Sequence, residues 1–215
     1  MTLAEPTTTL TDYAMAVVSW ASAAWLFRRA GGHVVRRTWV AGLALVGVAA
    51  TLGGSLHGFA PVLSPDGRAA LWRATYVVLG AANLLLLVGI AWALLPRRWR
   101  PPAVAAAAVH FVGFCVLLLR AMDFRLVIQD YALILLALTL LAAREARRDS
   151  PAARWLFVGV GVSAAGAVVQ RSGFALHVHF NHNDLFHVLQ TAGIWCYARA
   201  GAHLADRDQE AGTIL

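Results

Sequence analysis

Seven apolar runs, each close to twenty residues long, constrain this chain more than any other feature of its sequence. An α-helix needs about 20 apolar residues to cross the hydrocarbon core of a bilayer. Short connections separate the runs, and no polar domain interrupts them. We therefore predict an all-α, seven-transmembrane helix bundle that forms a single domain over residues 1–215. The predicted segments are 12–28, 38–60, 70–95, 102–120, 125–143, 153–171 and 184–203.

The composition agrees with a membrane protein and excludes several other classes. Hydrophobic residues make up 60% of the chain and charged residues 13%, whereas soluble domains average roughly 45–50% and 25%. All 18 basic residues are arginine. Without lysine no retinal Schiff base can form, so a retinal-binding photoreceptor is excluded. The arginines lie at segment ends, where they set topology, so nucleic-acid binding has no support.

Arginine is distributed unequally between the two ends of the predicted bundle. Thirteen of the 18 lie on the side that holds the first, third and fifth connections and the C-terminus. Cytoplasmic loops carry an excess of arginine and lysine. We therefore expect the N-terminus outside and the C-terminus in the cytoplasm, in a multi-pass protein of a bacterial inner (plasma) membrane.

The opposite side collects most of the histidines and several acidic residues. The densest stretch is His177-Val-His179-Phe-Asn-His182-Asn-Asp184-Leu-Phe-His187, which opens the last apolar segment. Imidazole and carboxylate groups bind first-row metals and move protons near neutral pH. Because burying them unpaired in a membrane is costly, their convergence indicates a polar site.

The strongest candidates at this site also have structural interpretations. Asp184 and His187 are three residues apart and share a helix face, so they can converge on one ion. Asp184 in a first helical turn would equally complement the helix dipole. His57, at the outer end of the second segment, is either a metal ligand or a helix-end histidine bonded to a carbonyl group.

Two further polar residues lie inside apolar segments. Asp130 is a site candidate because intramembrane carboxylates are rare, and its structural alternative is a pair with Arg73 or Arg120. His110 is expected to face the bundle interior and to pair with a residue such as Asn83, either structurally or in a proton path.

Sequence motifs at two of these places resemble those of the CREST superfamily, which unites alkaline ceramidases, progestin/adipoQ-type receptors and related lipid-remodelling proteins. The resemblance rests on the seven segments, on His57 with Ser55, and on the run Asn-Asp-Leu-Phe-His-Val-Leu-Gln that begins at residue 183. Members are similar in holding zinc with one histidine of segment two and a His-x-x-x-His pair of segment seven. The zinc activates water against a lipid amide or ester.

The chain departs from the CREST pattern at two positions. The first histidine of the segment-seven pair would fall at Asn183, so either the adjacent His182 is the shifted ligand or Asp184 replaces it. The serine of segment two, four residues before the histidine, would fall at Gly53, whereas Ser55 is two residues before His57.

We hypothesise a membrane-embedded, zinc-dependent hydrolase of a lipid amide or ester. The proposed zinc ligands are His57, His182 and His187, which leave a fourth position for water. A carboxylate would accept the proton, a serine would stabilise the oxyanion, and an arginine would hold an anionic lipid headgroup. Asp184 or Asp130 would accept the proton. Ser55 would stabilise the oxyanion, and Arg73 or Arg120 would hold the headgroup.

Two alternatives come from other functional classes. A non-catalytic receptor or sensor would bind a small ligand, a metal ion or protons in the same pocket. A proton-coupled transporter would use His110 and Asp130, but the sequence has no inverted repeat and no broken mid-membrane helix to support transport.

Overall fold

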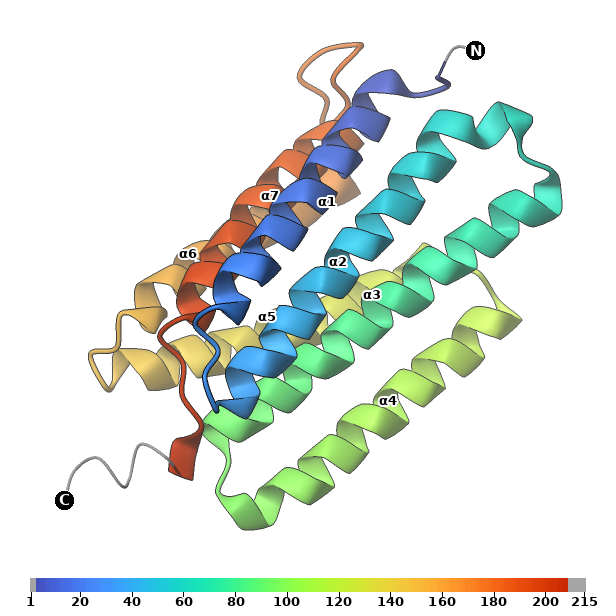
Figure 1. The fold of residues 1–215 in the computed structure, drawn as a ribbon. Helices are drawn as coiled ribbons and strands as arrows, with labels where there is room; N and C mark the ends of the chain where they lie inside the picture. The colour runs from blue at the N-terminus through green and yellow to red at the C-terminus, as the bar shows by residue number, and fades with distance from the viewer. Residues whose placement is uncertain (1–2, 209–215) are drawn as a thin grey trace.

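The computed structural model describes residues 3–208, which form seven α-helices joined by short connections (Figure 1). The helices and 3-10 turns are α1 (Pro6–Phe27), α2 (Val34–Phe59), η1 (Ala60–Val62), α3 (Pro65–Leu94), η2 (Arg97–Trp99), α4 (Arg100–Arg120), α5 (Phe124–Ala146), α6 (Ala152–Ser172) and α7 (His182–Gly201). The predicted all-α class is confirmed, and each predicted segment falls on one helix. The largest difference is in α1, which was predicted from residue 12 but begins at Pro6, because its first turns are rich in threonine rather than apolar.

Local signals in the sequence explain several of the helix ends. Ser64 caps α3 by accepting the backbone N–H of Gly67, and Asp123 caps α5 by accepting that of Arg125. α6 ends at Ser172 and is followed by Gly173, whose φ of 69° is in the left-handed region that glycine adopts without a Cβ clash.

The first and last helices of the bundle lie side by side. α1 packs against α2 on one side and α7 on the other, α3 packs beyond α2, and α6 packs against α5 and α7 (Figure 1). α4 packs mainly against α3 and lies at the edge. The main core contains Leu26, Trp39, Leu138 and Leu156, which are fully or almost fully buried, so α1, α2, α5 and α6 share it.

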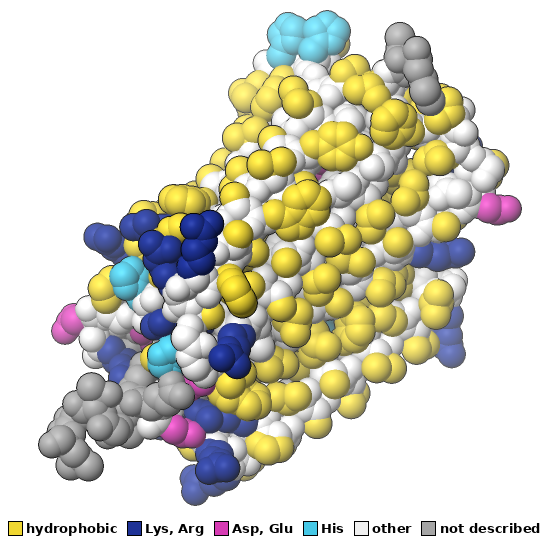
Figure 2. Space-filling view, viewed as in Figure 1, with side chains coloured by type: hydrophobic (Ala, Val, Ile, Leu, Met, Phe, Trp, Pro, Cys, Tyr) yellow, Lys and Arg dark blue, Asp and Glu magenta, His cyan; other side chains and the backbone are white. Residues whose placement is uncertain are grey.

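Five helical segments are long and apolar enough to cross a membrane, as expected for a multi-pass membrane protein. They are Val34–Val62, Pro65–Leu94, Arg97–Arg120, Phe124–Ala146 and Ala152–Ser172. Hydrophobic side chains cover most of the face seen in Figure 2. α1 and α7 are outside this set, since α1 carries several threonines and an aspartate and α7 begins with histidine, asparagine and aspartate. These two helices build the polar site.

The two ends of the bundle differ in charge. We call the end that holds the start of α1 and the start of α7 the N-terminal pole, and the other end the C-terminal pole. In Figure 2 a group of histidines protrudes at the N-terminal pole, whereas arginines gather toward the C-terminal pole. The sequence places thirteen of the 18 arginines on the latter side.

The segment after α7 folds back onto the start of α2. Asp206 accepts the backbone N–H groups of Val34 and Val35 at 2.8 and 2.9 Å. His33, the N-cap residue of α2, provides no capping side-chain bond. Asp206 therefore acts as a remote cap that joins the C-terminal segment to α2.

Candidate functional site

α7 begins with a capping box that fixes the position of its acidic residue. The Asn181 side chain accepts the backbone N–H groups of Asn183 and Asp184, and Asp184 Oδ2 accepts the N–H of Asn181 at 2.7 Å. These bonds satisfy donors that the first turn of a helix leaves without partners. Asp184 thus lies in the first turn, as its position in the sequence suggested.

Asp184 also joins α7 to α1. Thr8 Oγ1 donates a hydrogen bond to Asp184 Oδ1 at 2.7 Å, and both residues are 1% exposed. Both carboxylate oxygens therefore have hydrogen-bond donors. The bond fixes α1 against α7 at the N-terminal pole.

His187 lies on α7 and is held by a second threonine of α1. Its Nδ1 is 3.1 Å from Thr11 Oγ1, whose hydroxyl is placed to donate to the carbonyl oxygen of Thr8 at 3.0 Å. A hydroxyl group has only one hydrogen. Because Thr11 donates its hydrogen to the Thr8 carbonyl, the Thr11 oxygen can only accept a hydrogen bond from His187. From this network we assign the proton of the neutral imidazole to Nδ1, which leaves the lone pair on Nε2.

Nε2 of His187 faces a buried carboxylate on α1. Asp12 Oδ1 is 3.4 Å away, and Asp12 and His187 are 3% and 8% exposed. Asp12 Oδ2 is buried and has no hydrogen-bond partner among the described residues. An imidazole lone pair and an ionised carboxylate repel each other at low dielectric, so this arrangement favours a cation between them, either a proton or a metal ion.

Two glycines of α2 make room for Asp12. A Cβ atom built on Gly54 would lie 2.9 Å from Asp12 Cβ, and one built on Gly53 would lie 3.5 Å from Asp12 Oδ2. α2 therefore approaches α1 closely at this level. Gly53 is the position at which the CREST pattern has serine. A serine side chain at this position would therefore point toward the Asp12 carboxylate.

The two candidates on α2 also contact α1 or the residues before it. His57 Nδ1 is 3.1 Å from Glu5 Oε2, and its ring is edge-on to Trp72 with centroids 5.7 Å apart. Ser55 donates to the Thr51 carbonyl at 2.7 Å, and its Oγ is 3.0 Å from the hydroxyl of Tyr13. Both side chains thus lie at the α1–α2 contact.

His182 does not join these contacts. It is the first residue of α7, is partly buried, and makes no side-chain hydrogen bond, ion pair or ring contact with residues 3–208. Within the same range, no group of three or more histidine, cysteine, aspartate or glutamate side chains is arranged to hold a metal ion. The structure brings His187 to Asp12, but it does not bring His57, His182 and His187 into one group.

Asp130 belongs to a separate polar contact between α3, α4 and α5. His110 Nε2 lies 2.8 Å from Asp130 Oδ1, and the Asn83 amide donates to Asp130 Oδ2. The expected neighbours His110 and Asn83 therefore meet through Asp130, and this carboxylate pairs with His110 rather than with Arg73 or Arg120. Both arginines are exposed and form no hydrogen bond or ion pair with the described residues.

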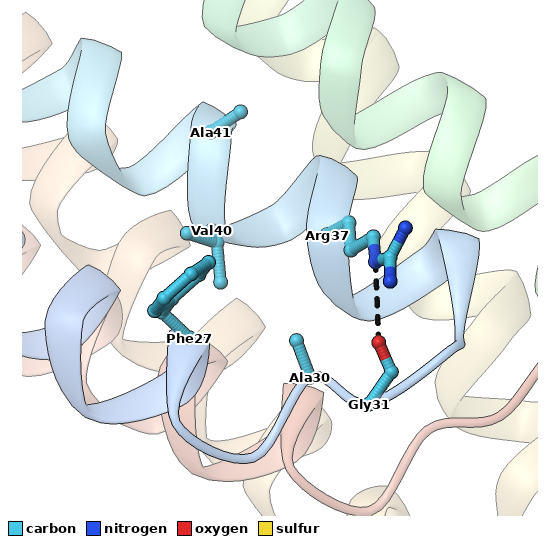
Figure 3. Close-up of a pocket in the computed structure, with 6 residues that line it drawn as sticks. All are labelled: Phe27, Ala30, Gly31, Arg37, Val40 and Ala41. Carbon is cyan, nitrogen blue, oxygen red and sulfur yellow. Dashed lines mark hydrogen bonds between the residues drawn. The ribbon is translucent and has the colours of Figure 1, made fainter.

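A surface hollow lies away from the histidine site, at the C-terminal pole. It is lined by Phe27, Ala30, Gly31, Arg37, Val40 and Ala41 (Figure 3). Its one charged side chain, Arg37, donates through Nε to the Gly31 carbonyl at 3.1 Å. The hollow therefore offers little polar chemistry.

The residues that sequence reasoning missed are on α1. Thr8, Thr11 and Asp12 supply the partners of Asp184 and His187. The available signal was Asp12 itself, a carboxylate at the start of an apolar run and preceded by threonines. The rule that intramembrane carboxylates mark sites was applied to Asp130, and it could also have been applied to Asp12, which opens the first predicted segment.

These features define an all-helical bundle in which five helices are long and apolar enough to span a membrane, with a buried acid–histidine site between its first and last helices. Residues 7–206 match DUF6962, which is described as a family of unknown function, and the chain belongs to this family. No curated protein and no solved structure matches the chain.

Proposed function

We propose that the chain crosses the membrane seven times, with the N-terminal pole outside and the C-terminal pole in the cytoplasm. The five apolar helices and the excess of arginine at the C-terminal pole support this topology. α1 and α7 complete the bundle, because their polar residues satisfy one another inside it.

We propose that the site at the N-terminal pole binds a divalent metal ion, with zinc as the ion that suits its donors. The observation that carries the proposal is the pair formed by His187 Nε2 and Asp12 Oδ1, 3.4 Å apart, with Asp12 Oδ2 left without a donor. Two ligands with bonds of about 2.0–2.1 Å in a tetrahedral site lie roughly 3.3 Å apart. The donors and their spacing therefore fit two zinc ligands.

We propose His57 as the third protein ligand and a lipid amide or ester as the substrate. His57 belongs to α2, and its Nδ1 lies 3.1 Å from Glu5 Oε2, so metal binding would require its ring to move toward Asp12 and His187. Relative to the CREST pattern, Asp12 would replace a histidine of segment seven, and His182 would take no part. A zinc ion bound there would acidify a water molecule and polarise the scissile carbonyl group.

The remaining residues would position these groups. Thr11 holds the His187 ring so that Nε2 points at Asp12, and Thr8 with Asp184 fixes α1 against α7. Arg73 and Arg120 are exposed and would be free to hold an anionic headgroup.

Metal content tests this proposal. Purified, tag-free protein supplied with zinc should retain about one ion per chain by mass spectrometry. Asp12→Asn and His187→Ala should each lose it, whereas His179→Ala, which changes an exposed loop histidine, should retain it. A folded wild-type protein that retains no metal contradicts the proposal. Retained zinc would then justify an assay of lipid amide and ester hydrolysis.

A second candidate is a proton sensor that uses the same residues. His57 lies 3.1 Å from Glu5 and His187 lies 3.4 Å from Asp12, so each pair can share a proton without a metal ion. Metal-free protein would then show a pH-dependent change in tryptophan fluorescence that His187→Gln reduces, with the His57–Glu5 pair accounting for the remainder. A profile unchanged by His187→Gln, with the variant still folded, contradicts this candidate.

A further inference from the structure

A second site is suggested where α1, α6 and α7 reach the C-terminal pole. Arg199 of α7 lies over three tryptophan rings at once. The distances from its Cζ atom to the ring centroids are 5.4 Å for Trp25, 5.2 Å for Trp155 and 5.9 Å for Trp195. Each distance is within the range of a cation–π contact.

Two more guanidinium groups stack on the same tryptophans. Arg29 lies 4.2 Å from the centroid of Trp25, and Arg154 lies 5.3 Å from that of Trp155. Both arginines are exposed. We call these six residues the arginine–tryptophan cluster: Arg29, Arg154, Arg199, Trp25, Trp155 and Trp195.

The cluster has hydrogen-bond donors without acceptors. Arg199 makes no side-chain hydrogen bond with residues 3–208, and its Nε is buried. The indole Nε1 of Trp155 is also buried and has no acceptor in the same range. Buried N–H groups without partners are costly, so an acceptor that reached these groups would be bound favourably.

The cluster also has positive charge that the protein does not neutralise. No carboxylate of residues 3–208 lies within 4.0 Å of the Arg29, Arg154 or Arg199 guanidinium. The pKa of His203, which follows α7, is lowered by burial and then by the charges of Arg199, Arg154 and Arg36. The lowered pKa of His203 thus reflects positive charge of the same cluster.

We infer that the arginine–tryptophan cluster binds the phosphate group of an anionic phospholipid. Guanidinium groups bind phosphate with paired, charge-assisted hydrogen bonds, and tryptophan favours the headgroup level of a bilayer. The arginines gather toward this pole (Figure 2), so a lipid of net negative charge suits it better than a zwitterionic one. The inference requires that the chain is embedded in a membrane, but it is independent of the metal site.

Native mass spectrometry of the detergent-purified full chain tests the inference. The probes are phosphatidylglycerol and phosphatidylcholine with identical acyl chains, and inorganic phosphate alone. We expect retention of phosphatidylglycerol in preference to phosphatidylcholine. Arg199→Gln should weaken phosphatidylglycerol binding roughly tenfold, as expected for the loss of hydrogen bonds to a charged group. Arg154→Gln removes an exposed side chain and should weaken binding in the same direction if Arg199→Gln does not fold.

The matched control is Arg98→Gln, which removes an exposed arginine of the same pole outside the cluster and should leave binding unchanged. Equal retention of the two lipids, or an equal loss in Arg98→Gln, overturns the inference. Binding of inorganic phosphate as tight as that of the lipid overturns the assignment to a lipid. Metal content is measured on the same samples, so failure here is distinguishable from failure of the metal proposal.

Discussion

Replacement of Thr8 by valine isolates the contact that holds α1 to α7. Valine has nearly the shape of threonine but cannot donate, so Asp184 Oδ1 loses a donor 2.7 Å away while it stays buried. Hydrogen bonds to charged groups contribute about 1.5–3 kcal/mol. For a chain of this size, 1 kcal/mol corresponds to roughly 2–4 °C in Tm. Thr8→Val should therefore lower Tm by roughly 3–12 °C.

The assay is thermal unfolding in one detergent, followed by tryptophan fluorescence. Thr139→Val is the matched control, because the Thr139 hydroxyl is exposed and donates to the Leu135 carbonyl of its own helix. Its free energy of unfolding should change by no more than about 0.5 kcal/mol.

A double-mutant cycle identifies the partner. In an Asp184→Ala background the acceptor is absent, so Thr8→Val should cost little more. If Thr8→Val and Thr139→Val shift Tm equally, or if Thr8→Val costs the same in both backgrounds, the reasoning about this contact is refuted.

Two other changes test packing and capping. Gly159→Ala places a Cβ 2.6 Å from the ring of Tyr197 and should destabilise by about 1–3 kcal/mol, whereas Gly161→Ala on the same helix meets nothing within 4 Å and should stabilise by up to about 1 kcal/mol. Thermal unfolding measures both, and the same sign for the two variants would contradict the packing. Asp206→Ala removes the remote cap of α2 and should cost about 0.5–2 kcal/mol, with faster hydrogen exchange at Val34 and Val35. Unchanged exchange at these amides would contradict that cap.

The lengths of the apolar runs predicted the helices well, because this signal is local. An apolar run near twenty residues permits little besides a membrane helix. Asn181, which stands just before the last apolar segment, is the N-cap of the observed capping box. α1 was predicted too short, since its threonines hide its first turns from a search for apolar residues.

The contacts of the site depended on information that the sequence carries only weakly. Helix rotation decides which face of α7 meets α1, and residues 176 positions apart meet there, as Thr11 and His187 do. The predicted trio of histidines assumed that α2 and α7 converge directly. In the structure α2 and α7 meet only to a small extent, while α1 packs extensively against both and places Asp12 opposite His187.

The position of α1 between α2 and α7 has a consequence for biosynthesis. A ribosome completes α1 long before α7. The partners of Thr8, Thr11 and Asp12 are therefore absent until five further helices have been made. If α1 is one of seven membrane spans, as proposed above, the carboxylate of Asp12 has no imidazole beside it during that time and would depend on water, the translocation machinery or a proton to remain in the membrane. Truncated nascent chains that stop before residue 182 would therefore hold α1 loosely, and completion of α7 would lock it. Completion of α7, the last of the seven helices, would thus fix the position of α1, the first.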